Sequence, residues 1–379
     1  IALSALTQTP SVKRSGLRVL TLLPGLRVST GVASWAMNYF RRLDHSLVHM
    51  DFALYWDTPS PYFAEIEAAG AKARVLPPVS RTAEHIRECR RILREGAYDI
   101  IHNNSLLITY PMMLCAEESV PVRILHSHST RLGENPWKEK RNKLFLPLLQ
   151  RTATDFAACS SPAGKAMFGE RPFSLVPNVV DTEKYRFQPL RRAEVRARMN
   201  AGGKYVIGTV GRTAEPKNPF FAMEVFLRVA QQDPDAEYWW IGSGPLDGPL
   251  RTCIAQLGLS GRVRLLGSRE DVPDLYQAMD CLFMPSRFEG VACACLEAQT
   301  AGLPCVASAA ASADAACTDL VEAVSLFESP GIWAGKLLSK KNLDIDRRVY
   351  ARQMAESPFS DKQAGEFLAG LYRKMLDAK

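Results

Sequence analysis

The sequence contains no apolar run of the roughly 18 residues that a membrane-spanning helix needs. It also has no C-x-x-C pair, no short-period repeat and no low-complexity segment, which argues against zinc ribbons, redox dithiols and solenoids. Residues 1–15 lack the order of charge, apolar core and cleavage site that a secretory signal has. These absences favour a globular protein, and a cytoplasmic location is the default expectation.

Cysteine usage gives the same indication. The chain has nine cysteines, an odd number, and most fall in apolar stretches such as CLFMPS at 281–286. We interpret them as small buried side chains in a reducing compartment rather than as disulfides or metal ligands.

The excess of basic residues is confined to one half of the chain. Residues 1–187 carry 24 Lys and Arg against 17 Asp and Glu, whereas residues 188–379 carry 23 of each. A basic first half suits an anionic partner such as a phospholipid surface, a lipid diphosphate or nucleic acid. Nucleic acid is the weakest of these, because no recognised motif accompanies the charge.

Short apolar runs alternate with helical patterns along the whole chain. LRVLTLL at 17–23 is typical of a buried strand, and the pattern restarts with KYVIGTVGR at 204–212. Strand–helix alternation with fully buried strands predicts parallel sheets covered on both faces. We therefore expect an α/β protein of two Rossmann-like units joined near residue 187, with ligands in the cleft between them at the carboxyl ends of the strands.

The strongest chemical signal is PSRFEGVACACLEAQTAGLP at 285–304. A predicted strand ends there, Glu289 follows in a loop, and Glu297 comes eight residues later on the next helix. The helix start at 290–292 offers free backbone N–H groups to a phosphate. Glu289 could accept hydrogen bonds from sugar hydroxyls, and Glu297 could accept them from a ribose diol. The alternative is a solvated acidic pair. Glu297 argues against this alternative, because it sits among apolar residues where an unpaired charge is costly.

A second signal is GTVGRTAEPKN at 208–218. Arg212 follows a predicted strand end, and Lys217 comes five residues later, before the next helix. Two cations in this position suit a diphosphate leaving group whose charge grows in the transition state. Taken alone, the same pair could be surface charge.

Together these motifs resemble glycosyltransferase family 4, which has the GT-B fold, and most closely its bacterial exopolysaccharide and capsule branch. The resemblance runs from about residue 17 to the C-terminus. It rests on STGVASWAMNYFRRLD (29–44), RILHSHST (123–130), RTATDFAACSSPAGKAMFG (151–169), VPNVVD (176–181), GRTAEPKN (211–218), IGSGP (241–245), REDVPDLYQAMD (269–280) and the Glu–seven residues–Glu segment at 285–304.

The resemblance implies three parts. These are an acceptor-binding Rossmann-like domain at 1–187, a donor-nucleotide domain at 188–355, and a C-terminal helix at 356–379 that crosses back to the first domain.

It also implies roles for individual residues. Arg212 and Lys217 would hold the donor diphosphate, and Glu297 would bind the ribose. Glu289 would contact the donor sugar. The remaining implied positions are Gly290 and Val291 beside the sugar through their backbone, Gly31 at the phosphates or the acceptor, His126 beside the transferred sugar, and Arg269 and Val272 at the edge of the nucleotide base.

Three histidines fall at or just after predicted strand ends. His126 and His128 share one face of an extended chain, and no third ligand stands at metal spacing. We expect His126 in the cleft and His102 in the core, and leave His128 open. Two Asp-x-Asp strings, at 233–235 and 344–346, lie in polar connections, so no bound metal and no cofactor other than the donor substrate is expected.

The segment NPWKEKRNKLFLPLLQR at 135–151 combines basic and large apolar side chains. It resembles a membrane-surface element, which would make the protein peripheral on the inner face of the membrane. An ordinary amphipathic helix covering the sheet remains an equal alternative. Pro147 argues against one continuous helix.

The sequence thus predicts a metal-independent, retaining transfer from a nucleotide-diphosphate sugar, with UDP as the favoured nucleotide, to a glycan or lipid-linked acceptor by a front-face route. Two alternatives stay open: a GT-B nucleotide-sugar epimerase, and a catalytically silent partner of another glycosyltransferase. Consumption of the sugar nucleotide without an acceptor would distinguish the epimerase.

Overall fold

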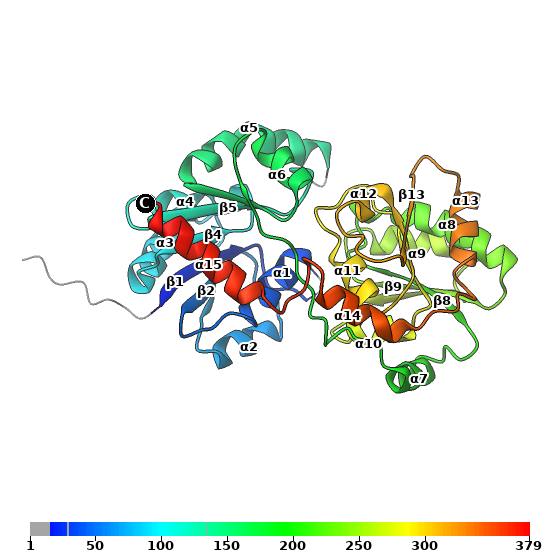
Figure 1. Cartoon of the computed structure of the whole chain (residues 1–379). Coiled ribbons are helices and arrows are strands. Elements are labelled where there is room, and N and C mark those ends of the chain that lie inside the picture. The colour runs from blue at the N-terminus through cyan, green and yellow to red at the C-terminus, as the bar shows by residue number, and fades with distance from the viewer. Residues whose placement is uncertain (1–15, 29, 134) are drawn as a thin grey trace, which may run out of the picture.

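The computed structural model describes residues 16–28, 30–133 and 135–379. Two parallel sheets lie side by side, each covered by helices (Figure 1). The expected α/β architecture of GT-B type is therefore confirmed. The division of the chain at residue 187 stays a prediction.

The first sheet has seven strands in the order β3-β2-β1-β4-β5-β6-β7. Its strands are β1 (Leu17–Leu23), β2 (Val48–Leu54), β3 (Ala73–Val75), β4 (Ile100–Asn103), β5 (Val122–Ser127), β6 (Asp155–Ala158) and β7 (Ser174–Leu175). Its helices are α1 (Gly31–Phe40), α2 (Tyr62–Ala68), α3 (Thr82–Gly96), η1 (Leu107–Thr109), α4 (Tyr110–Cys115), α5 (Pro136–Thr152) and α6 (Ser161–Phe168). The strand order reverses between β1 and β4, the kind of point where doubly wound sheets bind ligands.

The second sheet has six strands in the order β10-β9-β8-β11-β12-β13 and reverses between β8 and β11. Its strands are β8 (Tyr205–Val210), β9 (Ala236–Ile241), β10 (Val263–Gly267), β11 (Cys281–Met284), β12 (Cys305–Ser308) and β13 (Val321–Val324). Its helices are α7 (Pro189–Arg198), η2 (Glu215–Lys217), α8 (Pro219–Gln232), α9 (Asp247–Gln256), α10 (Val272–Ala278), α11 (Cys293–Thr300), α12 (Ala309–Ser312), α13 (Pro330–Leu338), η3 (Arg347–Val349) and α14 (Tyr350–Ala355).

The strands have largely apolar sequences because both faces of each sheet are buried. In β1, Val19 and Leu23 belong to one hydrophobic cluster, while Leu20 and Leu22 belong to the cluster on the other face. All four are at most 1% exposed. A strand buried on both faces needs apolar residues at every position, which is the pattern that predicted a parallel sheet. All nine cysteines are unpaired, and five of them are buried.

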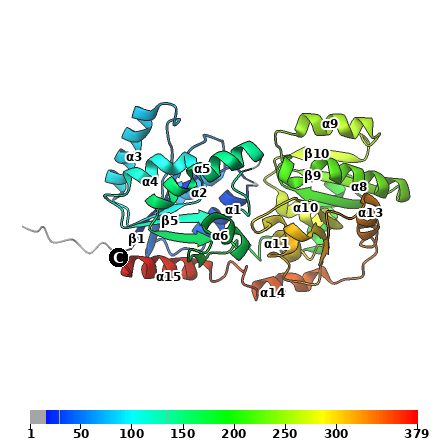
Figure 2. The same cartoon turned by 90° about the horizontal axis from the view of Figure 1, so that it is seen from above.

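The last helix, α15 (Ala364–Asp377), packs on the first half, whereas α14 packs against α11 of the second. Both run along the same edge of the molecule in Figure 2. A Cβ at Gly365 would lie 1.8 Å from the carbonyl oxygen of Arg42, so only glycine permits this approach of α15 to the end of α1. The predicted crossing of the C-terminal helix is confirmed.

The prediction that Pro147 interrupts the helix is wrong. Helix α5 runs unbroken from Pro136 to Thr152 with Pro147 inside it. The proline removes one backbone hydrogen bond, to the carbonyl group of Lys143. Both residues lie on the exposed side of the helix, where water can solvate that carbonyl group. Among the residues described, no helix is long and apolar enough to cross a membrane.

Candidate active site

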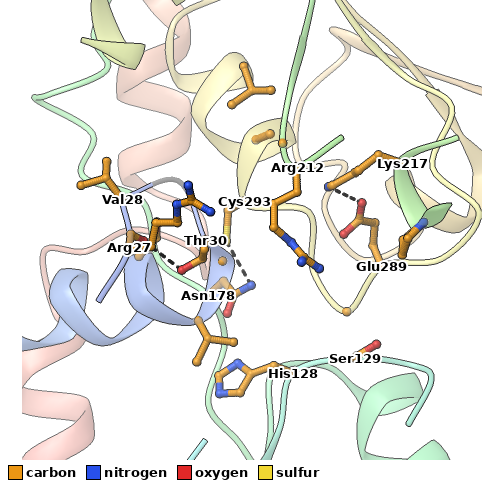
Figure 3. Close-up of a pocket in the computed structure, with 18 of the residues that line it drawn as sticks. Arg27, Val28, Thr30, His128, Ser129, Asn178, Arg212, Lys217, Glu289 and Cys293 are labelled. Carbon is orange, nitrogen blue, oxygen red and sulfur yellow. Dashed lines mark hydrogen bonds and ion pairs between the residues drawn. The ribbon is translucent and has the colours of Figure 1, made fainter. Parts of the chain in front are cut away.

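A pocket of about 610 Å³ lies between the two sheets. Its walls come from loops that follow the carboxyl ends of β1 and β5 in the first half and of β8 and β11 in the second. Figure 3 shows Arg212, Lys217 and Glu289 from the second half facing His128 and Ser129 from the first. The reversal point of the second sheet, between β8 and β11, therefore opens into the same space as the loop after β1 in the first sheet.

Most of the residues that the sequence singled out line this pocket. They are Gly31, Arg212, Lys217, Val272, Glu289, Gly290, Val291 and Glu297. Glycine at position 31 begins α1, and a Cβ there would meet nothing within 4 Å, so the first turn of that helix is open to the pocket.

The two cations are held by the turn that follows β8. Gly211 has φ of 149°, and a Cβ on it would lie 2.7 Å from Cε of Lys217, so this glycine makes room for the lysine stem. Lys217 ends the short η2 turn and donates to Glu289 Oε1 at 2.5 Å. Only 20% of the lysine and 16% of the glutamate side chain is exposed, so the ion pair is largely shielded from solvent.

The loop that carries Glu289 is hydrogen-bonded to residues of the first half of the molecule. Thr130 Oγ1 donates to the carbonyl oxygen of Glu289 at 3.0 Å, and Asn178 Nδ2 donates to that of Val291 at 2.9 Å. A Cβ at Gly290 would lie 2.1 Å from the carbonyl oxygen of His128. Position 290 therefore has to be glycine for the two walls of the pocket to meet.

Helix α11 begins immediately after this loop. Its N-cap residue, Ala292, has no side chain that can cap the helix, so the first backbone N–H groups lack a side-chain partner. The positive end of the helix and these N–H groups suit an anionic ligand group. The lysine–glutamate pair and this helix start belong to the same pocket.

Glu297 lies on α11, about one turn after the first residue of the helix. Burial raises the pKa of its carboxyl group, while a hydrogen bond from the Tyr276 hydroxyl, 2.9 Å from Oε2, opposes part of that rise. Tyr185, from the segment that connects the halves, also lines the pocket and acts in the same sense as Tyr276 on that pKa. A half-buried carboxyl group that is only partly satisfied can accept further hydrogen bonds from a diol.

Comparison with known proteins gives the family. Residues 204–338 match the model of the glycosyl transferases group 1. The chain is 32% identical over 289 residues to the putative glycosyltransferase EpsF of Bacillus subtilis, and the match covers 72% of this chain and 74% of EpsF. The chain belongs to the group 1 glycosyltransferases. It is an enzyme that transfers glycosyl groups from a nucleotide-sugar donor.

Two further relatives bear on the same family. The chain is 26% identical over 240 residues to the UDP-Gal:alpha-D-GlcNAc-diphosphoundecaprenol alpha-1,3-galactosyltransferase of Escherichia coli, covering 58% of this chain and 62% of that enzyme. The crystal structure of Anabaena HepE in complex with UDP-glucose matches with a TM-score of 0.78 at 18% identity, covering 94% of this chain and 100% of HepE. The second likeness is one of fold.

Within this glycosyltransferase, His126 does not line the pocket, contrary to expectation. It is 2% exposed inside β5, and its Nδ1 lies 2.9 Å from Nε2 of the equally buried His102. The strand ends at Ser127, so the chain leaves the sheet there and His128 becomes the histidine that lines the pocket. The expectation that His102 lies in the core is confirmed.

Arg269 is also outside the pocket lining of the glycosyltransferase. Its guanidinium group donates to both carboxylate oxygens of Asp271, at 2.8 and 2.7 Å. Its neighbours Glu270 and Val272 do line the pocket, so the segment reaches the site without the arginine side chain. No group of three or more His, Cys, Asp or Glu that could hold a metal occurs among the described positions.

The sequence interpretation missed several lining residues. Arg27, Arg131, Asn178, Lys184 and Tyr185 all contribute to the wall of the pocket. Asn178 lies in VPNVVD, one of the segments that carried the family resemblance, so that motif could have indicated it. Arg131 carried no local signal for its contact with the second half, where its guanidinium lies 4.9 Å from the ring of Phe288.

Proposed function

We propose that this enzyme transfers a sugar, with retention of anomeric configuration and without a metal ion, from a UDP-sugar to a hydroxyl of a glycan or lipid-linked acceptor. One observation carries the proposal. Two cations, Arg212 and Lys217, and two carboxyl groups, Glu289 and Glu297, line a single pocket between the sheets. The N-terminal half would bind the acceptor and the C-terminal half the donor.

The donor diphosphate would lie between the two cations and the start of α11. Lys217 is paired with Glu289 before a ligand arrives, so the diphosphate would take over the lysine and release the carboxylate to a sugar hydroxyl. Phosphate and sugar recognition would then be coupled through one ion pair. Glu297 would accept from the ribose, and Gly290 and Val291 would face the sugar through their backbone.

UDP is the nucleotide that the relatives support. HepE was crystallised with UDP-glucose, and the name of the Escherichia coli relative specifies a UDP-galactose donor. The name of that relative also specifies a diphosphoundecaprenol-linked acceptor, which supports a lipid-linked acceptor here.

The reaction would follow a front-face route. The bond between the anomeric carbon and the diphosphate oxygen breaks as the acceptor oxygen bonds to the same carbon from the same face. The acceptor proton passes to the departing phosphate oxygen. The negative charge that develops on the diphosphate is stabilised by Arg212 and Lys217, which makes these two cations the principal catalytic groups in the proposal.

A thermal-shift panel of UDP-, GDP- and ADP-sugars tests the donor assignment. A ligand that binds only the folded protein stabilises it by about 2.7 kcal/mol at 100 times its Kd. We expect UDP-sugars alone to raise the melting temperature clearly. Stabilisation by a GDP- or ADP-sugar instead would overturn the nucleotide assignment, and stabilisation by none of them would count against the donor site.

Helix α5 supports a membrane-bound acceptor. Trp137, Arg141, Leu144, Leu148 and Arg151 recur at helical spacing along its outer side, which we call the outer face of α5. Trp137 is 70% and Leu144 72% exposed, and the Arg141 guanidinium lies 5.3 Å from the Trp137 ring. The helix begins three residues after the pocket-lining Gly133, so a membrane on this face would lie near the pocket.

We expect the protein to bind vesicles that contain phosphatidylglycerol but not vesicles of phosphatidylcholine alone, because basic and apolar side chains act together on this face. The double variant Trp137→Ser/Leu144→Ser should weaken binding at least about tenfold, since it removes two exposed apolar groups that the membrane would bury. Leu190→Ser, which changes an 82% exposed leucine of α7, is the matched control. Equal binding of all three proteins in vesicle sedimentation would refute a role for this face.

A further inference from the structure

Three histidine rings form a column beneath the pocket. The His126 and His128 rings lie with their centroids 3.9 Å apart and their planes tilted by 35°, and His102 lies behind His126. The Trp35 ring meets all three edge-on, at centroid distances of 4.9, 4.9 and 5.1 Å. Rings packed in this way cannot rotate freely, so the direction in which each nitrogen points is set by the fold.

The orientation of the Asn104 amide group is fixed by the backbone around it. Asn104 follows β4 and is 4% exposed. Its Nδ2 donates to the carbonyl oxygen of His102 at 3.0 Å and to that of Leu22 at 3.4 Å. A flipped amide would set its oxygen against these two carbonyl oxygens, so Oδ1 has to face the other way.

Oδ1 of Asn104 lies 2.8 Å from Nε2 of His128. An amide oxygen only accepts hydrogen bonds, so the histidine nitrogen has to carry the proton. In a neutral imidazole the other nitrogen, Nδ1, then has the lone pair. Burial lowers the pKa of His128 to about 3, so the ring is neutral near pH 7.

We propose that Asn104 is a positioning residue that holds His128 in the Nε2–H tautomer, so that its Nδ1 accepts a hydrogen bond from a substrate hydroxyl in the pocket. His128 lines the pocket opposite Arg212, as Figure 3 shows. The inference rests on the proposed function, because a pocket for sugars presents hydroxyl donors to this wall. The backbone carbonyl groups fix the orientation of the Asn104 amide, and the amide fixes the tautomer of the His128 imidazole. The imidazole can then accept a hydrogen bond only from a donor group of the substrate.

The tautomer also determines what His128 does not do. An imidazole with its free nitrogen toward the pocket rejects a substrate group that can only accept, and a neutral ring adds no cation to the diphosphate. The hydroxyl could belong to the donor sugar or to the acceptor. In both cases a hydroxyl group donates a hydrogen bond to Nδ1. The steady-state kinetics described below distinguish the two.

The first measurement is nitrogen-15 NMR of the histidine-labelled full chain. The wild-type protein should show His128, assigned by its loss in His128→Gln, with a protonated Nε2 and a lone pair on Nδ1. Asn104→Ala should shift that signal towards the other tautomer. A wild-type His128 protonated on Nδ1 would overturn the proposal even if no variant folds, and this reading is independent of whether the pocket binds a sugar nucleotide.

Asn103→Ala serves as the structural control. Asn103 is equally buried in β4, but its side chain bonds Thr109 Oγ1 and the backbone of Ser105 rather than a histidine. It should leave the His128 signal unchanged. An equal shift of that signal in Asn103→Ala would make the effect of Asn104 a general loss of packing and would contradict the assignment.

The kinetic arms identify the hydroxyl. Loss of one hydrogen bond to a neutral group should change the affected constant about five- to tenfold in Asn104→Ala. A rise in KM for the sugar nucleotide, with UDP binding unchanged, assigns the contact to the donor sugar. A rise in KM for the acceptor assigns it to the acceptor. No change in either constant, nor in kcat, would refute a substrate contact.

Discussion

Replacing Arg212 or Lys217 with alanine is expected to lower kcat by about 10²- to 10³-fold with a smaller change in KM. Both side chains line the pocket, and the proposed transition state places growing negative charge on the diphosphate between them. Removal of one prearranged charge partner from a catalytic site typically costs rates of this size. Steady-state kinetics with saturating acceptor measures the effect.

Arg251→Ala is the matched control, because Arg251 is an exposed arginine of α9 in the same half and does not line the pocket. It should keep wild-type kinetics. Wild-type kcat in both Arg212→Ala and Lys217→Ala would remove the basis for placing the leaving group between these cations. A loss confined to KM would show that the cations bind the donor without acting on the chemical step.

Replacing Glu289 with glutamine is expected to separate nucleotide binding from sugar transfer. The carboxylate is paired with Lys217 at 2.5 Å, so its removal frees the lysine for the diphosphate. UDP should then bind as tightly as before or a few-fold more tightly. Transfer should fall about 10- to 100-fold, because a charge-assisted hydrogen bond to the sugar is lost. Calorimetric titration with UDP and turnover of the UDP-sugar measure the two quantities.

Glu215→Gln controls for loss of a carboxylate near Lys217, because Glu215 lies in the same η2 turn as that lysine. Its carboxylate pairs with Arg287 and does not line the pocket, so neither UDP affinity nor turnover should change. A marked loss of UDP affinity in Glu289→Gln would contradict the idea that this glutamate restrains Lys217 before the donor binds.

The fold was predictable because short local sequence patterns indicate its strands and helices. Apolar runs such as residues 17–23 and 204–210 are continuous because their strands are buried on both faces. The loops that carry Arg212 and Glu289 could be placed at the pocket by the general rule that ligands bind at the carboxyl ends of parallel strands. The GT-B architecture itself came from the family resemblance.

Features that depend on where an element ends, or on contacts between distant residues, were not predictable. His126 and His128 alternate with the same strand periodicity, but β5 stops at Ser127, and only the later residue reaches the pocket. The pairing of Lys217 with Glu289 spans 72 residues, and that of Asn178 with Val291 spans 113. No local pattern records such separations.

The behaviour of Pro147 has a similar cause. Proline disfavours a helix interior, yet its cost depends on whether water can reach the carbonyl group that loses its partner. That depends on which side of α5 faces solvent, which only the packed structure shows.

A crystal structure of the protein with a non-hydrolysable UDP-sugar analogue tests the central claim most directly. We predict that the diphosphate oxygens lie within hydrogen-bond distance of Arg212 and Lys217, that Lys217 has left Glu289, and that the ribose faces Glu297. A diphosphate bound outside the pocket between the two sheets, or turned away from both cations, would contradict the account.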